Sequence, residues 1–262
     1  MTDPRPASTS TDIQRPRKPI VLAEAIAEGI VQAGMRPGDR LPVEAAMVLQ
    51  YGAGRASIRE ALRILEAEGI VETRVGAGGG AFVASPRRES IARPLSVLMR
   101  MSDIGLREIL DARLLIEPAL AASAAVHRTA EQATQLQDAA EALELLDEGG
   151  EEWRRMNREF HTAIAEAAAN RPLAVMWDVL SMIADGHDAG VRYPEHSLHD
   201  AEAAHRKILK AIISGDAETA ESAMRAHLEA MASHVAIEYP QLLGEPIALV
   251  RSRTGGAVRS RA

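Results

Sequence analysis

The 262-residue sequence contains no cysteine. This absence excludes a disulfide scaffold, a cysteine-ligated metal site and a thiol nucleophile, and it suits the reducing cytoplasm, where we expect the protein to be located. No uninterrupted apolar run approaches the roughly 18–20 residues that a membrane helix needs, so we predict no membrane partner. Residues 1–18 lack the apolar core of a secretory signal and are expected to form a disordered tail.

The sequence also lacks an overall excess of basic residues. Its net charge of -7 argues at first against a partner rich in phosphate. The charge is unevenly distributed, however, because residues 1–88 contain 12 basic and 10 acidic residues, whereas residues 89–262 contain 18 and 27. The N-terminal part of the chain is mildly basic and the C-terminal part is acidic, as expected if only the N-terminal part contacts nucleic acid.

Residues 19–84 show the pattern of three helices followed by a hairpin. Leu22, Ile26 and Ile30 recur at helical spacing, and a second helix is expected to begin near Pro42. The glycine-containing turn 52–54 leads into a third helix with an apolar stripe, which ends at Gly69. Two short strands then flank the glycine-rich segment 76–80.

Two helices joined by a short turn, the second with one apolar and one basic face, are typical of a helix-turn-helix. The second helix of this motif enters the major groove of DNA, and the residues at its N-terminal end reach the base edges. Here those residues are Arg55, Ala56, Ser57 and Arg59. The hairpin is interpreted as a wing, with the charge of Arg74 beside its turn. The alternative is that the arginines on this helix only form a face exposed to solvent. Composition alone favours this alternative, but the order of helix, turn, helix and hairpin disfavours it.

Residues 103–238 carry only helical signals and predict an antiparallel bundle of about six helices. Thr129 begins a capping box, Asn170 precedes a helix opened by Pro172, and Asp216 is placed to cap another helix. We expect a linker leading into a helix at 85–102 and a tail at 239–262. The predicted fold class is therefore mainly α, with an N-terminal winged helix-turn-helix at 19–84 ahead of the helical bundle.

Three histidines lie on apolar helix faces of this bundle, at His161, His205 and His227, and Asn157 shares the face of His161. A buried polar group costs a few kcal/mol unless it is partnered. One shared divalent metal would satisfy all four side chains, with zinc as the first choice for imidazole ligands and nickel or manganese as further options. Hydrogen-bonded core histidines are the alternative, and the residues by themselves leave the choice open.

Arg113 also lies among apolar positions. It can pair with Glu117 one helical turn later. Its planar guanidinium can equally bind the carboxylate of a small effector. The two roles are compatible, so Arg113 is predicted as an effector-binding residue.

The segment 37–83, PGDRLPVEAAMVLQYGAGRASIREALRILEAEGIVETRVGAGGGAFV, resembles the DNA-binding domain of the GntR family of bacterial regulators. The resemblance covers residues 20–84 and implies that Arg55 and Arg59 contact DNA, with help from Ala56, Ser57 and the wing around Gly76. The sequence departs from the family at two positions. Ala45 stands where the family often has a DNA-contacting arginine, and Gly54 replaces the usual serine.

Residues 103–238 resemble the FCD effector domain of the FadR subfamily, through ARLLIE at 112–117, NREFH at 157–161 and AHRKILKAIISGD at 204–216, followed by MRAHL. The resemblance implies a metal held by Asn157, His161, His205 and His227, the first of which is more often aspartate. It also implies a small organic acid as effector. We therefore expect a transcription regulator, acting as a repressor, that binds a double-stranded DNA operator as a homodimer and responds to the acid at its metal site.

Other functions fit less of the sequence. A metal-dependent hydrolase with an accessory winged helix needs a general base, and neither an HExxH motif nor a paired-carboxylate pattern is present. The winged helix could instead bind protein, or the chain could be a purely structural DNA-binding protein. Neither function explains the polar side chains predicted inside the helical bundle. The sequence therefore favours a regulator over an enzyme.

Overall fold

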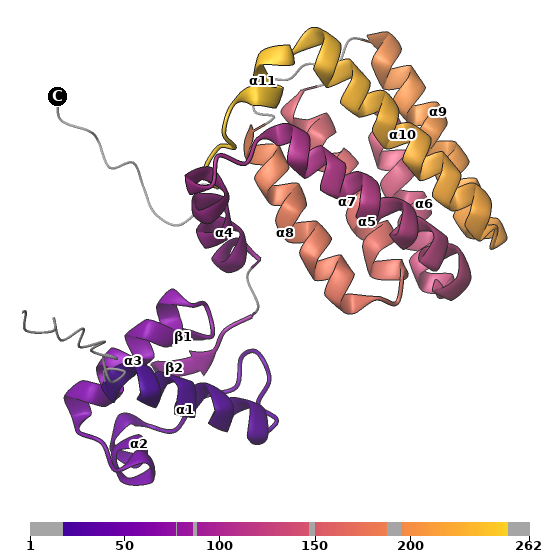
Figure 1. Ribbon diagram of the computed structural model, residues 1–262. Coiled ribbons are helices and arrows are strands. Elements are labelled where there is room, and N and C mark those ends of the chain that lie inside the picture. Colours follow the sequence, from indigo (N-terminus) through magenta and orange to yellow (C-terminus); the bar gives the residue numbers. More distant parts are fainter. Residues whose placement is uncertain (1–17, 77, 86–87, 147–149, 188–194, 251–262) are drawn as a thin grey trace, which may run out of the picture. The chain divides into compact units, whose positions relative to one another are not determined.

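The computed structural model describes residues 18–76, 78–85, 88–146, 150–187 and 195–250. Of the expected tails 1–18 and 239–262, residues 1–17 and 251–262 lie outside these ranges, and Lys18 is the first residue of a helix. The chain forms two compact units, residues 1–90 and 91–262 (Figure 1). Each unit has its own apolar core. Apart from one two-stranded sheet, the regular structure of the described residues is helical, which confirms the predicted mainly-α fold. The described helices include none with the length and apolar character needed to span a membrane.

The first unit packs three helices against a hairpin. The helices are α1 (Lys18–Gln32), α2 (Glu44–Tyr51) and α3 (Arg55–Ala67), and the strands are β1 (Val71–Arg74) and β2 (Gly80–Val83). Apolar side chains at helical spacing face inward, so that Ile26, Met47, Ile58 and Leu65 are almost completely buried. The buried stripe fixes which face of α3 remains exposed to solvent.

Glycine shapes the turn between α2 and α3. Gly52 ends α2 in the left-handed conformation, with φ 58°, which side chains with a Cβ atom rarely adopt. Gly54 is the N-cap of α3 and offers no side-chain hydrogen bond, so the departure from the family's serine leaves this helix start without a side-chain cap. In the hairpin, Val71 pairs with Val83, and Arg40 adds a bridge to Phe82 at the outer edge of β2.

The second unit is a bundle arranged around one long helix. Helix α5 (Leu106–His127) packs against α7 (Glu151–Ala167), α8 (Arg171–His187), α9 (Glu195–Ser214) and α10 (Ala217–Glu238), and its start also contacts the short helix that follows α10. Helix α6 (Ala130–Glu144) packs on α7 and α9. Leu120, Phe160, Ile164, Trp177 and Ile212 form the middle of the core. This confirms the predicted helical bundle.

The polar signals at the helix ends are confirmed. Thr129 accepts a hydrogen bond from the backbone N–H of Gln132, whose side chain accepts one from the N–H of Thr129. Asp216 accepts from the N–H of Thr219 at the start of α10. Pro118, in the middle of α5, cannot donate to the carbonyl of Leu114, and Arg225 donates to that carbonyl instead at 3.4 Å.

Two segments differ from their predicted structure. Residues 85–102, expected to be a linker leading into a helix, consist mostly of α4 (Glu89–Met101), in spite of Pro94 inside it. Ala92 and its apolar neighbours on α4 pack into the second unit, and this burial offsets the lost backbone hydrogen bond. The segment 239–262 was expected to be a tail, but it contains α11 (Pro240–Gly244), and beyond this helix Ile247 is fully buried beside α4.

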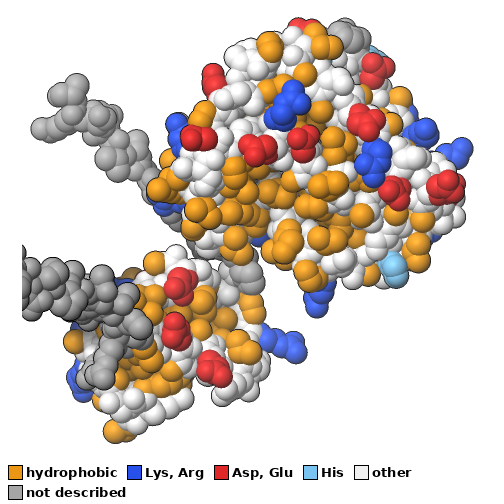
Figure 2. All heavy atoms as spheres, in the orientation of Figure 1, with side chains coloured by type: hydrophobic (Ala, Val, Ile, Leu, Met, Phe, Trp, Pro, Cys, Tyr) orange, Lys and Arg blue, Asp and Glu red, His pale blue; other side chains and the backbone are white. Residues whose placement is uncertain are grey.

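Not all large apolar side chains of the second unit are buried. On α5, Leu115 is 78% exposed and Val126 62%, and on the adjacent α8, Val175 is 44% and Met176 58% exposed. Figure 2 shows apolar side chains gathered over the face of this unit on which α8 lies in Figure 1. Exposed apolar surface of this kind is typical of a contact with another molecule.

Candidate functional site

The exposed face of α3 carries the side chains predicted to contact DNA. Arg55, Ala56 and Arg59 are exposed and Ser57 is half-buried, all within the first five residues of the helix. Arg59 is held in place from outside the helix, because its Nε donates to both carboxylate oxygens of Glu44 on α2, at 3.1 and 2.9 Å. This pair leaves the two terminal guanidinium nitrogens of Arg59 available for another acceptor.

The wing is stabilised by two arginines that pack on one ring. Arg74 lies 4.1 Å over the centre of Phe82 and also donates to Glu72. Arg40 approaches the same ring and donates from Nη2 to the carbonyl oxygen of Gly79 at 2.6 Å. The hairpin turn is therefore tied to the segment before α2. Gly76, with φ 102°, lies in this turn and is exposed.

A groove separates α3 from the wing. It has a volume of about 350 Å³ and is bordered by Arg40, Arg59, Arg63, Thr73 and Gly79. Arg40 was not predicted from the sequence as part of this surface. Its contact with Gly79 spans 39 residues, and the only local signal was a basic residue just before Pro42.

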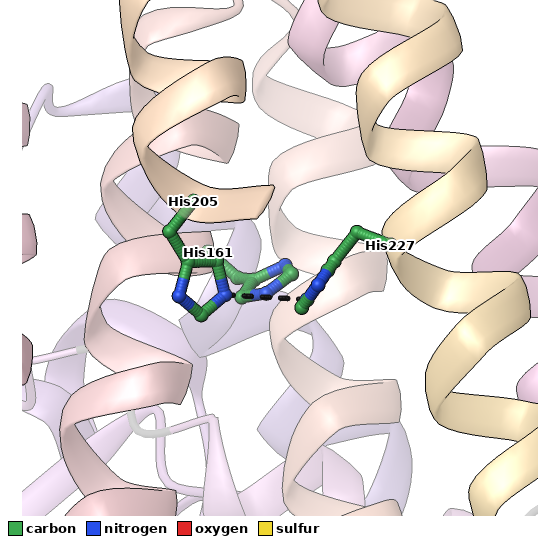
Figure 3. A group of neighbouring side chains, drawn as sticks. All are labelled: His161, His205 and His227. Atoms are coloured by element: carbon green, nitrogen blue, oxygen red, sulfur yellow. Dashed lines mark hydrogen bonds between the residues drawn. The ribbon is translucent and has the colours of Figure 1, made fainter. Parts of the chain in front are cut away.

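In the second unit, three buried imidazoles come together from three helices. His161 on α7, His205 on α9 and His227 on α10 are 2%, 2% and 7% exposed. Figure 3 shows the rings converging on one point. One ring nitrogen of each lies within 4.8 Å of the others, and the Nε2 atoms of His205 and His227 are 3.2 Å apart. The three histidines predicted as ligands thus meet in space, whereas the ring of His234, two turns further along α10, packs against Tyr239.

Several polar atoms around this cluster are buried without a hydrogen-bond partner. They include the Oδ1 atom of Asn157, the Nε2 atom of His161 and the Nδ1 atom of His205. Asn157 lies one turn before His161 and lines a cavity of about 240 Å³ that His227 also lines. A buried acceptor without a donor is costly, and a bound cation would remove this cost for acceptors that face it.

Burial sets the charge of the cluster. Burial is the main reason that the pKa of His205 lies well below its usual range, and the neighbouring His227 and His161 lower it further. Burial and then His161 lower the pKa of His227 to about 3. Both rings are therefore neutral near pH 7, which is the form in which imidazole binds a metal ion.

Arg113 points toward the same region from α5. It is 7% exposed and its Nε donates to Glu117 at 2.5 Å, as the spacing of four residues predicted. Arg113 also borders a small second cavity, which shares Trp153, Asn157 and Met231 with the larger one. Glu117 also contacts His161, with Oε2 lying 2.5 Å from Nδ1, and this contact was not predicted from the sequence.

Two family profiles match the sequence, each on one of these sites. The profile described as "Bacterial regulatory proteins, gntR family" matches residues 21–83, and the FCD domain profile matches residues 108–230. The Uxu operon transcriptional regulator of Escherichia coli K12 is 31% identical over 228 residues, which are 84% of this chain and 87% of that protein. The chain belongs to the GntR family.

Other GntR-family proteins are similar over most of their length. The HTH-type transcriptional regulator LutR of Bacillus subtilis is 28% identical, over 74% of this chain and 90% of that protein. The putative L-lactate dehydrogenase operon regulatory protein of E. coli K12 is 30% identical, over 79% of this chain and 82% of that protein. Among solved structures, a Streptococcus agalactiae GntR protein has the same fold, with a TM-score of 0.62 and 23% identity, over 82% of this chain and 99% of that chain.

Membership of the GntR family identifies the chain as a DNA-binding transcription regulator. The family profile covers α3 and the wing, so the exposed arginine face belongs to the DNA-binding domain. The FCD profile covers the histidine cluster, and FCD domains bind a metal ion or a small-molecule effector.

The pKa values of the two neutral histidines predict that acid destabilises the metal-free protein. Unfolded histidine binds a proton near pH 6.5, whereas folded His227 does so only near pH 3. Between these values the unfolded state binds more protons, so stability is lost as the pH falls below about 6.5. We expect a slope of up to about 1.4 kcal/mol per pH unit for each of His205 and His227, measured by urea unfolding. His227→Leu should reduce the slope of the unfolding free energy against pH, whereas substitution of the exposed His127 should leave it unchanged. Equal slopes for wild type and His227→Leu would contradict the prediction.

Proposed function

We propose that this GntR-family regulator holds a divalent metal, with zinc as the first choice, between Asn157, His161, His205 and His227. The observation that carries the proposal is the convergence of three buried imidazoles, whose ligand atoms lie within 4.8 Å of one another. Imidazole nitrogens at about 2.0–2.1 Å from a zinc ion would require only small movements of these side chains. Asn157 supplies an uncharged amide oxygen and the other three ligands are imidazole nitrogens, so the proposed ligands bring no negative charge to the metal.

We further propose that a small organic acid binds at this metal and controls the affinity for the operator. The cavity of about 240 Å³ extends from the cluster and is lined by Asn157, His227 and Lys207. A carboxylate in it would meet a metal ion and an ammonium group, and Arg113 borders the adjoining cavity. One relative is described as a regulator of an L-lactate dehydrogenase operon, which supports a hydroxy acid as one class to test.

The proposal includes repression, with release of the operator when the acid binds. The experiment is a titration of an operator duplex from the promoter beside the protein's own gene, followed by fluorescence anisotropy. With zinc-loaded protein, one member of a panel of hydroxy, sugar and dicarboxylic acids should weaken binding by about 5- to 150-fold. Metal-stripped protein should not respond. A lack of response to every acid, or an equal response without metal, would contradict the proposal.

We propose that the regulator is a homodimer, since a two-fold protein is needed to read two half-sites of a pseudo-palindromic operator. The exposed apolar side chains of α5 and α8 support this, because Leu115, Val126, Val175 and Met176 are large apolar residues left exposed on two helices that pack together, as expected where a second copy of the same helices binds.

Leu115→Arg is therefore expected to produce monomers, because an arginine from each copy would replace an apolar contact in the proposed interface. Sedimentation velocity and binding to the full operator should show the change, with operator affinity lowered by at least about 10-fold. Leu145→Arg is the matched control, since Leu145 is 81% exposed at the end of α6 and outside the proposed interface. Dimers that persist in Leu115→Arg would exclude this surface.

A further inference from the structure

Glu117 lies between two charged or polar partners inside the helical unit. Its Oε1 atom accepts a hydrogen bond from Nε of Arg113, and its Oε2 atom is 2.5 Å from Nδ1 of His161. The three side chains are 3%, 9% and 1% exposed, in the order Glu117, Arg113 and His161. They form one continuous hydrogen-bonded chain that ends at a predicted ligand of the metal.

The ion pair keeps Glu117 in its carboxylate form. Burial alone would raise the pKa of this carboxyl group, but the charge of Arg113, followed by His161, holds it well below its usual range. A carboxylate only accepts hydrogen bonds, so the hydrogen it shares with His161 belongs to Nδ1 of the imidazole. In the neutral ring, Nε2 then carries the lone pair, and this atom is buried without a partner beside the other two histidines.

We propose that Glu117 is a positioning residue for the metal: it fixes the orientation and the tautomer of His161 so that Nε2 is presented as a ligand. The inference rests on the proposed metal site. A metal-bound histidine commonly donates its second N–H to a carboxylate, which makes the imidazole a stronger ligand. Within the cluster of His161, His205 and His227, the Nδ1 atom of His161 lies beside a carboxylate, whereas the Nδ1 atom of His205 is buried without a partner, so His161 is better oriented as a ligand than His205.

Arg113 acts on the metal through Glu117. As long as the carboxylate is present, the pair is neutral and adds no repulsion toward a divalent cation. Without the carboxylate, the guanidinium would keep its positive charge in the same buried region and lose the negative charge that Glu117 places beside it. Removal of the Glu117 charge therefore weakens metal binding in two ways, through a less basic His161 and through a repelling Arg113.

The test is the zinc affinity of Glu117→Gln, measured on the full-length protein by competition with a chromophoric chelator. We expect affinity to fall by about 10- to 100-fold relative to wild type. Asp111→Asn, on an exposed position of the same helix, is the control and should bind zinc as wild type does. In the double variant Arg113→Gln/Glu117→Gln, part of the loss should be recovered, because the positive charge of Arg113 is removed as well. An affinity of Glu117→Gln within about twofold of wild type would overturn the role of Glu117.

A second readout does not depend on how well a variant folds. In metal-free wild-type protein, the nitrogen chemical shifts of His161 should show the proton on Nδ1. A proton on Nε2 would overturn the inference, even if zinc binds. Failure of the metal site itself gives a different result, because wild-type protein would then bind no zinc at all.

Discussion

His205→Ala should lose the metal. The substitution removes one of three buried imidazoles and leaves His161, His227 and the neutral oxygen of Asn157, a set that holds a divalent ion weakly. Elemental analysis after purification without chelators should give close to one metal ion per chain for wild type and far less for the variant. The melting temperature should fall too, since a metal at 100 to 1,000 times its dissociation constant stabilises a protein by about 2.7–4.1 kcal/mol.

The matched control for this experiment is His127→Ala. His127 lies at the exposed end of α5 and bonds only to Ser123 of its own helix, among the contacts of the described residues. It should keep its metal and its melting temperature. If His205→Ala kept a full metal ion, His205 would not be a ligand, and the contact between His205 and His227 would be an ordinary core hydrogen bond.

Arg59→Ala should lower the affinity for the operator far more than the affinity for a scrambled duplex. Glu44 holds Nε of Arg59, which leaves two terminal nitrogens to donate to O6 and N7 of a guanine. Loss of such a contact costs about 1–3 kcal/mol and relaxes specificity at one base pair. Arg55→Ala should behave in the same way, because Arg55 is also exposed in the first turn of α3.

Gel-shift titration at one fixed salt concentration separates base reading from phosphate contact, since phosphate contacts affect every duplex equally. Arg155→Ala is a suitable control, because Arg155 is a surface arginine of the other unit that pairs with Glu152 and Glu159. If Arg55→Ala and Arg59→Ala both bound the operator as wild type does, α3 would not be the reading helix.

The sequence predicted well the features that depend on neighbouring residues. The apolar stripe of α3, the turn at Gly52, the capping box at Thr129 and the pair between Arg113 and Glu117 each involve positions at most four residues apart. The regular period of a helix determines such contacts before the chain folds. The fold class could be predicted for the same reason.

Contacts between distant residues could not be predicted in this way. Glu117 and His161 are 44 residues apart, and Arg40 and Gly79 are 39 apart, so each contact depends on how whole elements pack. The extent of the helix around Pro94 could not be predicted for a related reason, since it also depends on packing between elements. Proline disfavours a helix interior, and only the packing of α4 in the second unit offsets that local preference.

The most direct test is the metal content of the wild-type protein, purified without chelators and analysed for zinc, nickel and manganese. We expect close to one ion per chain, and anomalous scattering from crystals should locate it between His161, His205 and His227. A protein that carries no metal, and takes up none when these three ions are offered, would contradict the proposed site. The three imidazoles would then be core residues satisfied by hydrogen bonds, and the effector would have to bind elsewhere.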